Sequence, residues 1–169
     1  ARQLAVRVLR QVEQRRGFSN RILSEHLERH PELSRPDRGL TTALVYCVLR
    51  ERARLDHLID AVAKKPAGIR GEIRSLLRVA VFELIVLEKP VAVVGAEASR
   101  TAKAFDRDGR LKRLITAIVA NVDRRHPELE GALESAAPLE QLVVRWSVPR
   151  WLATRWIDEL GEVLVGGDD

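Results

Sequence analysis

Arginine and glutamine side chains recur at helical spacing near the start of the chain, and these residue types can bind phosphates and base edges. The polar positions are Gln3, Arg7, Arg10 and Gln14. An apolar stripe takes the opposite face of the same helix: Ala5, Val8, Leu9 and Val12. The polar face carries hydrogen-bond donors and no carboxylate. That pattern is typical of a solvated helix surface or of a surface that contacts nucleic acid.

A second basic zone covers residues 98–126, where eight arginines and lysines accompany three aspartates. Its central turn carries four of these cations: Arg107, Arg110, Lys112 and Arg113. The first 21 residues hold six arginines and one glutamate, whereas residues 127–169 hold nine acidic residues and three arginines. The formal net charge of +5 therefore conceals two basic zones and an acidic tail, which indicates a polyanion-binding surface on one side only.

No pattern for catalysis or for metal binding emerges. The sequence has no glycine-rich phosphate loop and no nucleophile motif. Cys47 is the single cysteine and lies in an apolar run, so it is expected in the core and cannot form an internal disulfide. His26 and His30 are four residues apart, but no third ligand is placed by the sequence, and a solvated helix face is favoured. We assign no catalytic and no metal-binding residue.

Helical periodicity dominates the elements that position these side chains, and no segment is a convincing strand. Residues 79–87 suit a strand by propensity, but the surrounding 3.6-residue period predicts a buried helix that Pro90 ends. Ser34 and Asp37 form a plausible capping box. No apolar run is long enough to span a membrane, so a cytoplasmic protein is expected. The expected helices are 2–16, 19–29, 36–50, 52–64, 69–88, 92–106, 108–125, 138–147 and 150–160.

The stretch from Glu72 to Lys103 carries the strongest family signal. It reads EIRSLLRVAVFELIVLEKPVAVVGAEASRTAK, and L-L-R-V-A-V-F-E-L followed by Pro90, Ala92, Glu97, Ala102 and Lys103 resembles the NusB-type RNA-binding domain. That resemblance implies an all-α bundle of two packed helical subdomains. It also implies that the arginine-rich first helix contacts RNA.

Two further segments resemble the same family. One begins at Asp37-Arg38 and continues through Arg50 to Leu55-Asp56 and Ile59. Its charged residues are expected to be structural, because the helix dipole favours an acidic residue near the start of a helix and a basic residue near its end. The other covers residues 114–120, where Thr116 and Ala120 replace the family's asparagine and arginine. These replacements remove two polar groups, so no role is carried over to that helix.

The tail repeats an Arg-Trp pair every five residues, within R-W-S-V-P-R-W-L-A-T-R-W. Five-residue spacing does not keep one helical face, and Pro149 interrupts the run, so packing is favoured over a ladder of stacked bases. The segment P-R-W-L-A-T-R-W-I-D-E-L-G resembles the one that follows the NusB-like domain in RsmB-type ribosomal RNA cytosine methyltransferases. Trp151 and Trp156 are therefore expected to pack between the tail and the helical body or a following domain.

The sequence thus predicts an all-α NusB-like helical domain at 1–136 and a helical linker at 137–169. By resemblance, the chain is the RNA-binding domain of an RsmB-type 16S ribosomal RNA (cytosine-C5) methyltransferase and is not catalytic alone. S-adenosylmethionine and a catalytic domain in cis are implied for the full-length enzyme, with ribosomal RNA as partner. A stand-alone NusB-like antitermination adaptor and a purely structural helical scaffold remain as alternatives.

Overall fold

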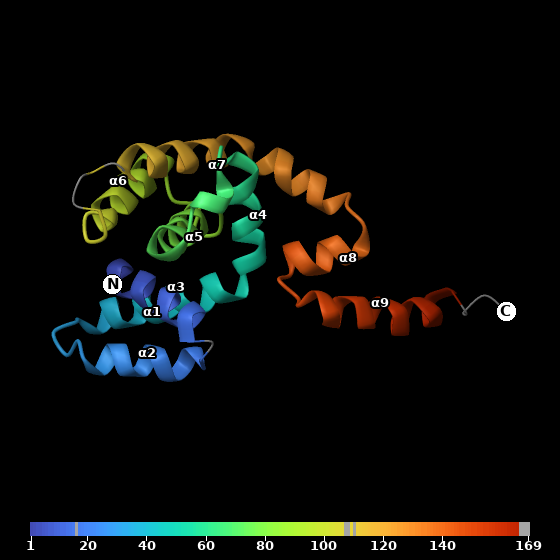
Figure 1. The fold of residues 1–169 in the computed structure, drawn as a ribbon, viewed down its shortest axis with the longest axis horizontal. Helices are drawn as coiled ribbons and strands as arrows, with labels where there is room; N and C mark the ends of the chain where they lie inside the picture. Colours follow the sequence, from blue (N-terminus) through green and yellow to red (C-terminus); the bar gives the residue numbers. More distant parts are fainter. Residues whose placement is uncertain (16, 107–108, 110, 166–169) are drawn as a thin grey trace.

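A computed structural model describes residues 1–15, 17–106, 109 and 111–165 (Figure 1). The described residues form helices and turns without a strand, which confirms the all-α fold class. The elements in chain order are α1 (Arg2–Arg15), α2 (Ser19–Glu28), α3 (Arg35–Arg50), α4 (Arg52–Val62), a 3₁₀ turn (Pro66–Gly68), α5 (Gly71–Ile85), α6 (Val91–Ala102), α7 (Leu111–Glu134), α8 (Pro138–Glu140), a π-helical turn (Gln141–Arg145) and α9 (Arg150–Val165).

Helix α5 runs through the centre of the bundle, and α1, α3, α4, α6 and α7 pack around it (Figure 1). Every residue from Ser75 to Leu84 is buried. A helix enclosed on all sides needs apolar residues on all faces, which explains why this run also suits a strand by propensity. The predicted buried helix is confirmed, but it spans Gly71–Ile85 instead of 69–88 and so ends before Pro90, which precedes α6. At Gly71 the backbone takes a φ of 63° that favours glycine.

Local signals at the start of α3 also act as predicted. The Ser34 hydroxyl accepts the Asp37 amide at 3.2 Å and donates to the Asp37 carboxylate at 2.7 Å. Arg38 donates from Nη1 to the Leu27 carbonyl at 2.8 Å, and this carbonyl at the end of α2 also accepts the His30 amide at 3.3 Å. The predicted structural roles of Asp37 and Arg38 are therefore confirmed. Cys47 packs, partly buried, against the core.

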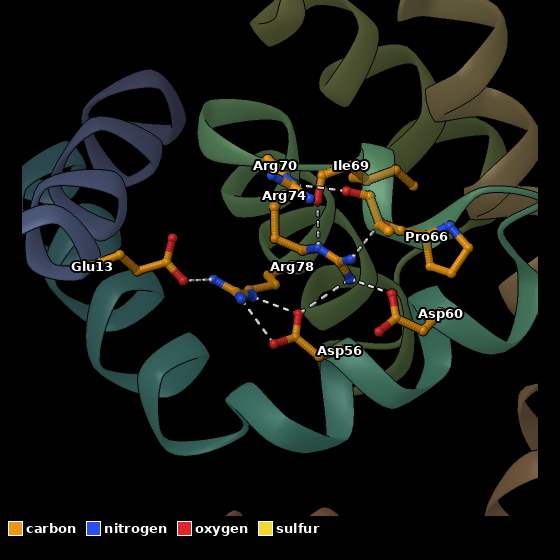
Figure 2. Close-up of polar contacts among 9 residues, drawn as sticks. Glu13, Asp56, Asp60, Pro66, Ile69, Arg70, Arg74 and Arg78 are labelled. Atoms are coloured by element: carbon orange, nitrogen blue, oxygen red, sulfur yellow. Dashed lines mark hydrogen bonds and ion pairs between the residues drawn. The ribbon is translucent and has the colours of Figure 1, made fainter.

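Charged residues join three helices around Arg78 of α5 (Figure 2). Arg78 is 6% exposed; it donates to Asp56 of α4 at 2.7 and 2.8 Å and to Glu13 of α1 at 2.5 Å. Burial alone lowers the pKa of Arg78, but these hydrogen bonds outweigh burial and raise it. One turn earlier, Arg74 donates to Asp60 at 2.6 Å. The buried cation is therefore paired, and these arginines serve the fold.

Helix α7 corrects one prediction. The sequence placed a helix end at 125 because Pro127 follows, yet α7 continues through Pro127 to Glu134. The missing proline N–H frees the Asp123 carbonyl, and His126 Nδ1 lies 3.2 Å from that oxygen as its replacement donor. Arg54 of α4 also donates to Glu130 at 2.7 Å. A tertiary contact beyond the proline thus stabilises the extra turns.

The tail leaves the bundle after α7, and α9 points away from it (Figure 1). A long-range bond helps to hold the tail where it turns: the Ser147 hydroxyl accepts a hydrogen bond from the Ala53 amide at 3.0 Å. Ala53 lies in the first turn of α4, so Ser147 satisfies an otherwise free helix amide from 94 residues away. Ser147 itself has a φ of 53°. The predicted domain boundary after residue 136 falls between α7 and α8 and stays a prediction.

Candidate nucleic-acid interface

The outer face of α1 presents three of its four predicted contact residues to solvent. Gln3, Arg7 and Gln14 are exposed. Arg10 is half-buried instead: its guanidinium lies over Gly71, and its Nε is 4.0 Å from a carboxylate oxygen of Glu72. The face lacks a carboxylate within α1, as predicted, but α5 supplies one to Arg10. Arg7 is therefore the arginine of this face that is open to a ligand.

The second predicted zone is described in part. Lys112 and Arg113 are exposed in the first turn of α7, whereas Arg107 and Arg110 lie outside the described residues. Two further cations, Arg100 and Lys103, are exposed near the end of α6. Both belong to the basic zone at residues 98–126, but neither was among the predicted contact residues. Their i, i+3 spacing places both side chains on one face of a helix, and this is the sequence signal that could have identified them.

Two hollows connect these zones into one surface. The smaller, of about 190 Å³, lies between the start of α1 and α6 and is lined by residues that include Gln3 and Arg100. The larger, of about 540 Å³, is a groove between α6 and α7 whose lining includes Arg100, Lys103 and Lys112. Arg100 borders both hollows. The fold therefore joins the predicted face of α1 to the predicted start of α7 through a residue of α6.

The cations on this surface differ from the structural ones in their partners. Among the described residues, Arg7, Arg100, Lys103, Lys112 and Arg113 make no ion pair. A phosphate can approach such side chains without displacing a carboxylate, so its attraction is not offset by a broken pair. We call these five residues, together with Gln3 and Gln14, the basic surface.

Arg2, at the edge of the basic surface, is structural. Its guanidinium donates to Glu83 at 2.8 Å and lies 2.5 Å from Glu97. Glu83 is 2% exposed and also accepts from Lys89 at 2.5 Å. Burial alone raises the pKa of the Glu83 carboxyl, but the hydrogen bonds from Arg2 and Lys89 outweigh burial and hold the pKa below its usual value. Because Arg2 is paired with this buried carboxylate, we do not include it in the basic surface.

The tail tryptophans are open to solvent. The exposed fractions are 64% for Trp146, 70% for Trp151 and 41% for Trp156. Arg145 lies 5.6 Å from the centroid of the Trp146 ring, a cation–π contact. The helical body therefore does not cover Trp151 or Trp156. Packing of these two rings against another domain stays a prediction.

Metal and membrane features are absent from the part of the chain that the structure describes. No group of three or more His, Cys, Asp or Glu side chains there could hold a metal ion. His26 contacts Gln11, and His30 Nδ1 lies 2.8 Å from Glu32. None of the helices searched is both long and apolar enough to cross a bilayer.

Comparison with known proteins places the chain among RNA-related families. The NusB family matches residues 1–124. The chain is 29% identical over 161 residues to a probable ribosomal RNA small subunit methyltransferase B of Bacillus subtilis, covering 95% of the chain and 35% of that protein. It is 33% identical over 167 residues to ribosomal RNA small subunit methyltransferase B of Thermus thermophilus, covering 96% and 36%.

A transcription antitermination protein is also similar. The chain is 30% identical over 112 residues to the NusB protein of Syntrophomonas wolfei, covering 64% of the chain and 83% of that protein. The methyltransferase matches extend across the tail, and the matched region is their amino-terminal portion. The chain thus spans about a third of the length of the methyltransferases that it matches.

Proposed function

Since the chain belongs to the NusB family, we propose that it is the RNA-binding domain of an RsmB-type ribosomal RNA (cytosine-C5) methyltransferase. The observation that carries the proposal is the basic surface, where exposed cations without ion pairs extend from α1 over α6 to α7. Phosphate contacts of this kind position a protein on RNA without reading its sequence. The domain would hold ribosomal RNA in the cytoplasm while another domain performs the chemistry.

The described residues do not fit S-adenosylmethionine. The larger of the two hollows described above lies between two helices, and no strand among the described residues leads into a glycine-rich turn that could hold the cofactor. At the groove, the Asp106 carboxylate accepts the Leu111 amide at 2.6 Å. We therefore place cofactor and catalysis in the remainder of a full-length methyltransferase. Isothermal titration of this chain with S-adenosylmethionine should give no saturable heat, and a saturable isotherm would contradict this assignment.

The tail suits attachment of that catalytic domain. Trp151 and Trp156 are exposed on a helix that leaves the bundle (Figure 1), and exposed aromatic side chains of this size mark interaction sites. Docking in cis would bury them. The bond between Ser147 and Ala53 would then set the angle between the RNA-binding body and the catalytic domain.

A stand-alone antitermination adaptor is the second candidate, because the antitermination protein of Syntrophomonas wolfei also matches. That match covers 64% of the chain, whereas the methyltransferase matches cover 95% and 96% and include the tail. The tail therefore favours the methyltransferase domain. Both candidates share the basic surface and the same expected affinity for RNA.

Fluorescence anisotropy with a structured ribosomal RNA fragment at several salt concentrations tests the RNA-binding proposal. Each phosphate contact contributes about 0.7 to 0.9 to the slope of log affinity against log salt concentration. Replacing Arg7 and Lys112 with alanine should therefore weaken binding and flatten the slope by about 1.4 to 1.8 units. Arg52→Ala is the matched control, since Arg52 is exposed but lies on α4, away from the basic surface. Equal binding by the double variant and the parent at every salt concentration would refute the proposal.

A further inference from the structure

The groove between α6 and α7 has the size and lining of a ligand site. Its volume of about 540 Å³ falls within the roughly 300–1,000 Å³ of small-molecule pockets. Its lining includes several small side chains, among them Ala92 and Ala96 of α6 and Thr116 of α7. A Cβ built on Gly95 would lie 3.9 Å from Thr116 Cγ2, so the two helices approach closely beneath the groove. The short side chains leave the groove open above that contact.

The rim of the groove is positively charged. Arg100, Lys103 and Lys112 border it, are exposed and make no ion pair among the described residues. The carboxylate of Asp106 accepts the Leu111 amide, at the start of α7, where the helix dipole stabilises a negative charge. An apolar floor with a cationic rim suits a ligand that combines a flat apolar body with negative charges.

Ser99 adds a polar group to this lining. Its hydroxyl oxygen is buried and makes no hydrogen bond within the described part of the chain. The hydroxyls of Thr101 and Thr116 instead bond to the carbonyls one turn earlier, at 2.9 Å each. A buried hydroxyl without a partner is unfavourable. The hydroxyl oxygen has almost no accessible surface in this side-chain conformation, so a ligand could bond to it only after the Ser99 side chain rotates toward the groove.

We propose that this groove holds one unstacked base of a single-stranded RNA segment, with the rim cations on the flanking phosphates. A base has flat apolar faces and polar edges, and protein recognition of RNA favours unpaired bases that can leave the stack. The proposal rests on the proposed RNA-binding function and extends it, because it makes single-stranded RNA the substrate class of this surface. A peptide occupant would need acidic residues to match the same rim.

Filling the groove tests this directly. Ala96 is exposed and lines the groove, and leucine is a good helix former, so Ala96→Leu should occupy the space while keeping α6 folded. The matched control is Ala43→Leu on α3, an exposed alanine outside the groove. The probes are a short single-stranded RNA with one 2-aminopurine and a blunt-ended, fully paired RNA duplex of two strands. Anisotropy reports affinity, and the fluorescence of 2-aminopurine reports unstacking.

The parent and Ala43→Leu should bind the single strand with a rise in 2-aminopurine fluorescence. Ala96→Leu should bind it at least about fivefold more weakly, without the fluorescence rise. Its affinity for the duplex and its salt slope should be unchanged, because the phosphate contacts remain. Equal single-strand binding by Ala96→Leu, or an equal loss on the duplex, would overturn the groove assignment alone. Failure of the parent to bind either RNA would instead overturn the proposed function.

Discussion

Replacing Arg78 with methionine tests how strongly its charged contacts stabilise the bundle. The side chain of Arg78 is 7% exposed, and those of its partners Asp56 and Glu13 are 26% and 21% exposed. Removing a buried member of an ion pair destabilises by about 3–5 kcal/mol, because the remaining charges lose their partner. Both carboxylates keep some contact with water, so we expect the lower end, about 3 kcal/mol.

In a chain of this length, 1 kcal/mol lowers the melting temperature by about 2–4 °C. Arg78→Met should therefore melt about 6–12 °C below the parent in a circular dichroism scan. Arg52→Met is the control and should stay within about 0.5 kcal/mol, since Arg52 is an exposed surface residue. Adding Glu13→Gln to Arg78→Met should recover part of the loss by neutralising a carboxylate whose ion-pair partner among the described residues was Arg78, whereas Asp56 keeps Arg74 at 3.5 Å. A single variant as stable as the control would refute this account of the network.

Three further predictions concern other parts of the molecule. Glu83→Gln should be less stable than the parent at neutral pH and should lose less stability on acidification. The pKa of Glu83 is lowered in the folded state, so its ionised carboxylate stabilises the fold at any pH above the ordinary carboxyl pKa, and this contribution is lost as the pH falls through the folded pKa. Identical melting-temperature profiles from pH 7 to 3 would contradict this. Ser147→Ala should cost about 1 kcal/mol in chemical denaturation because it frees the Ala53 amide, and an unchanged midpoint would exclude the capping role. Trp151→Ala should leave the melting temperature of this chain unchanged but lower that of the full-length protein, and no effect in either would argue against interdomain packing.

Features set by nearby residues could be predicted from the sequence. The period of apolar residues identified α5, and the spacing of Ser34 and Asp37 identified the cap of α3. Both features depend on residues a few positions apart, and helix geometry determines which of their side chains are neighbours. The family resemblance supplied the all-α architecture, which the structure and the NusB match confirm.

Features set by distant residues could not be predicted. Pro127 predicted a helix end because the contact between Arg54 and Glu130, 76 positions apart, is invisible in local sequence. The partnership of Arg10 with Glu72 likewise needs α1 and α5 to lie side by side. The basic surface was found only in part, because the position of Arg100 between two hollows depends on the packing of α1, α6 and α7.

Mapping the backbone amides that respond to RNA tests the central claim most directly. The chain has 169 residues, a size suited to two-dimensional NMR with a ribosomal RNA fragment at moderate salt. We expect the amide signals of Gln3, Arg7, Arg100 and Lys112 to shift with RNA concentration, whereas those of α2 and α9 should not. Shifts confined to α2 or α9, or no shifts at saturating RNA, would contradict the assignment of the basic surface as the RNA-binding site.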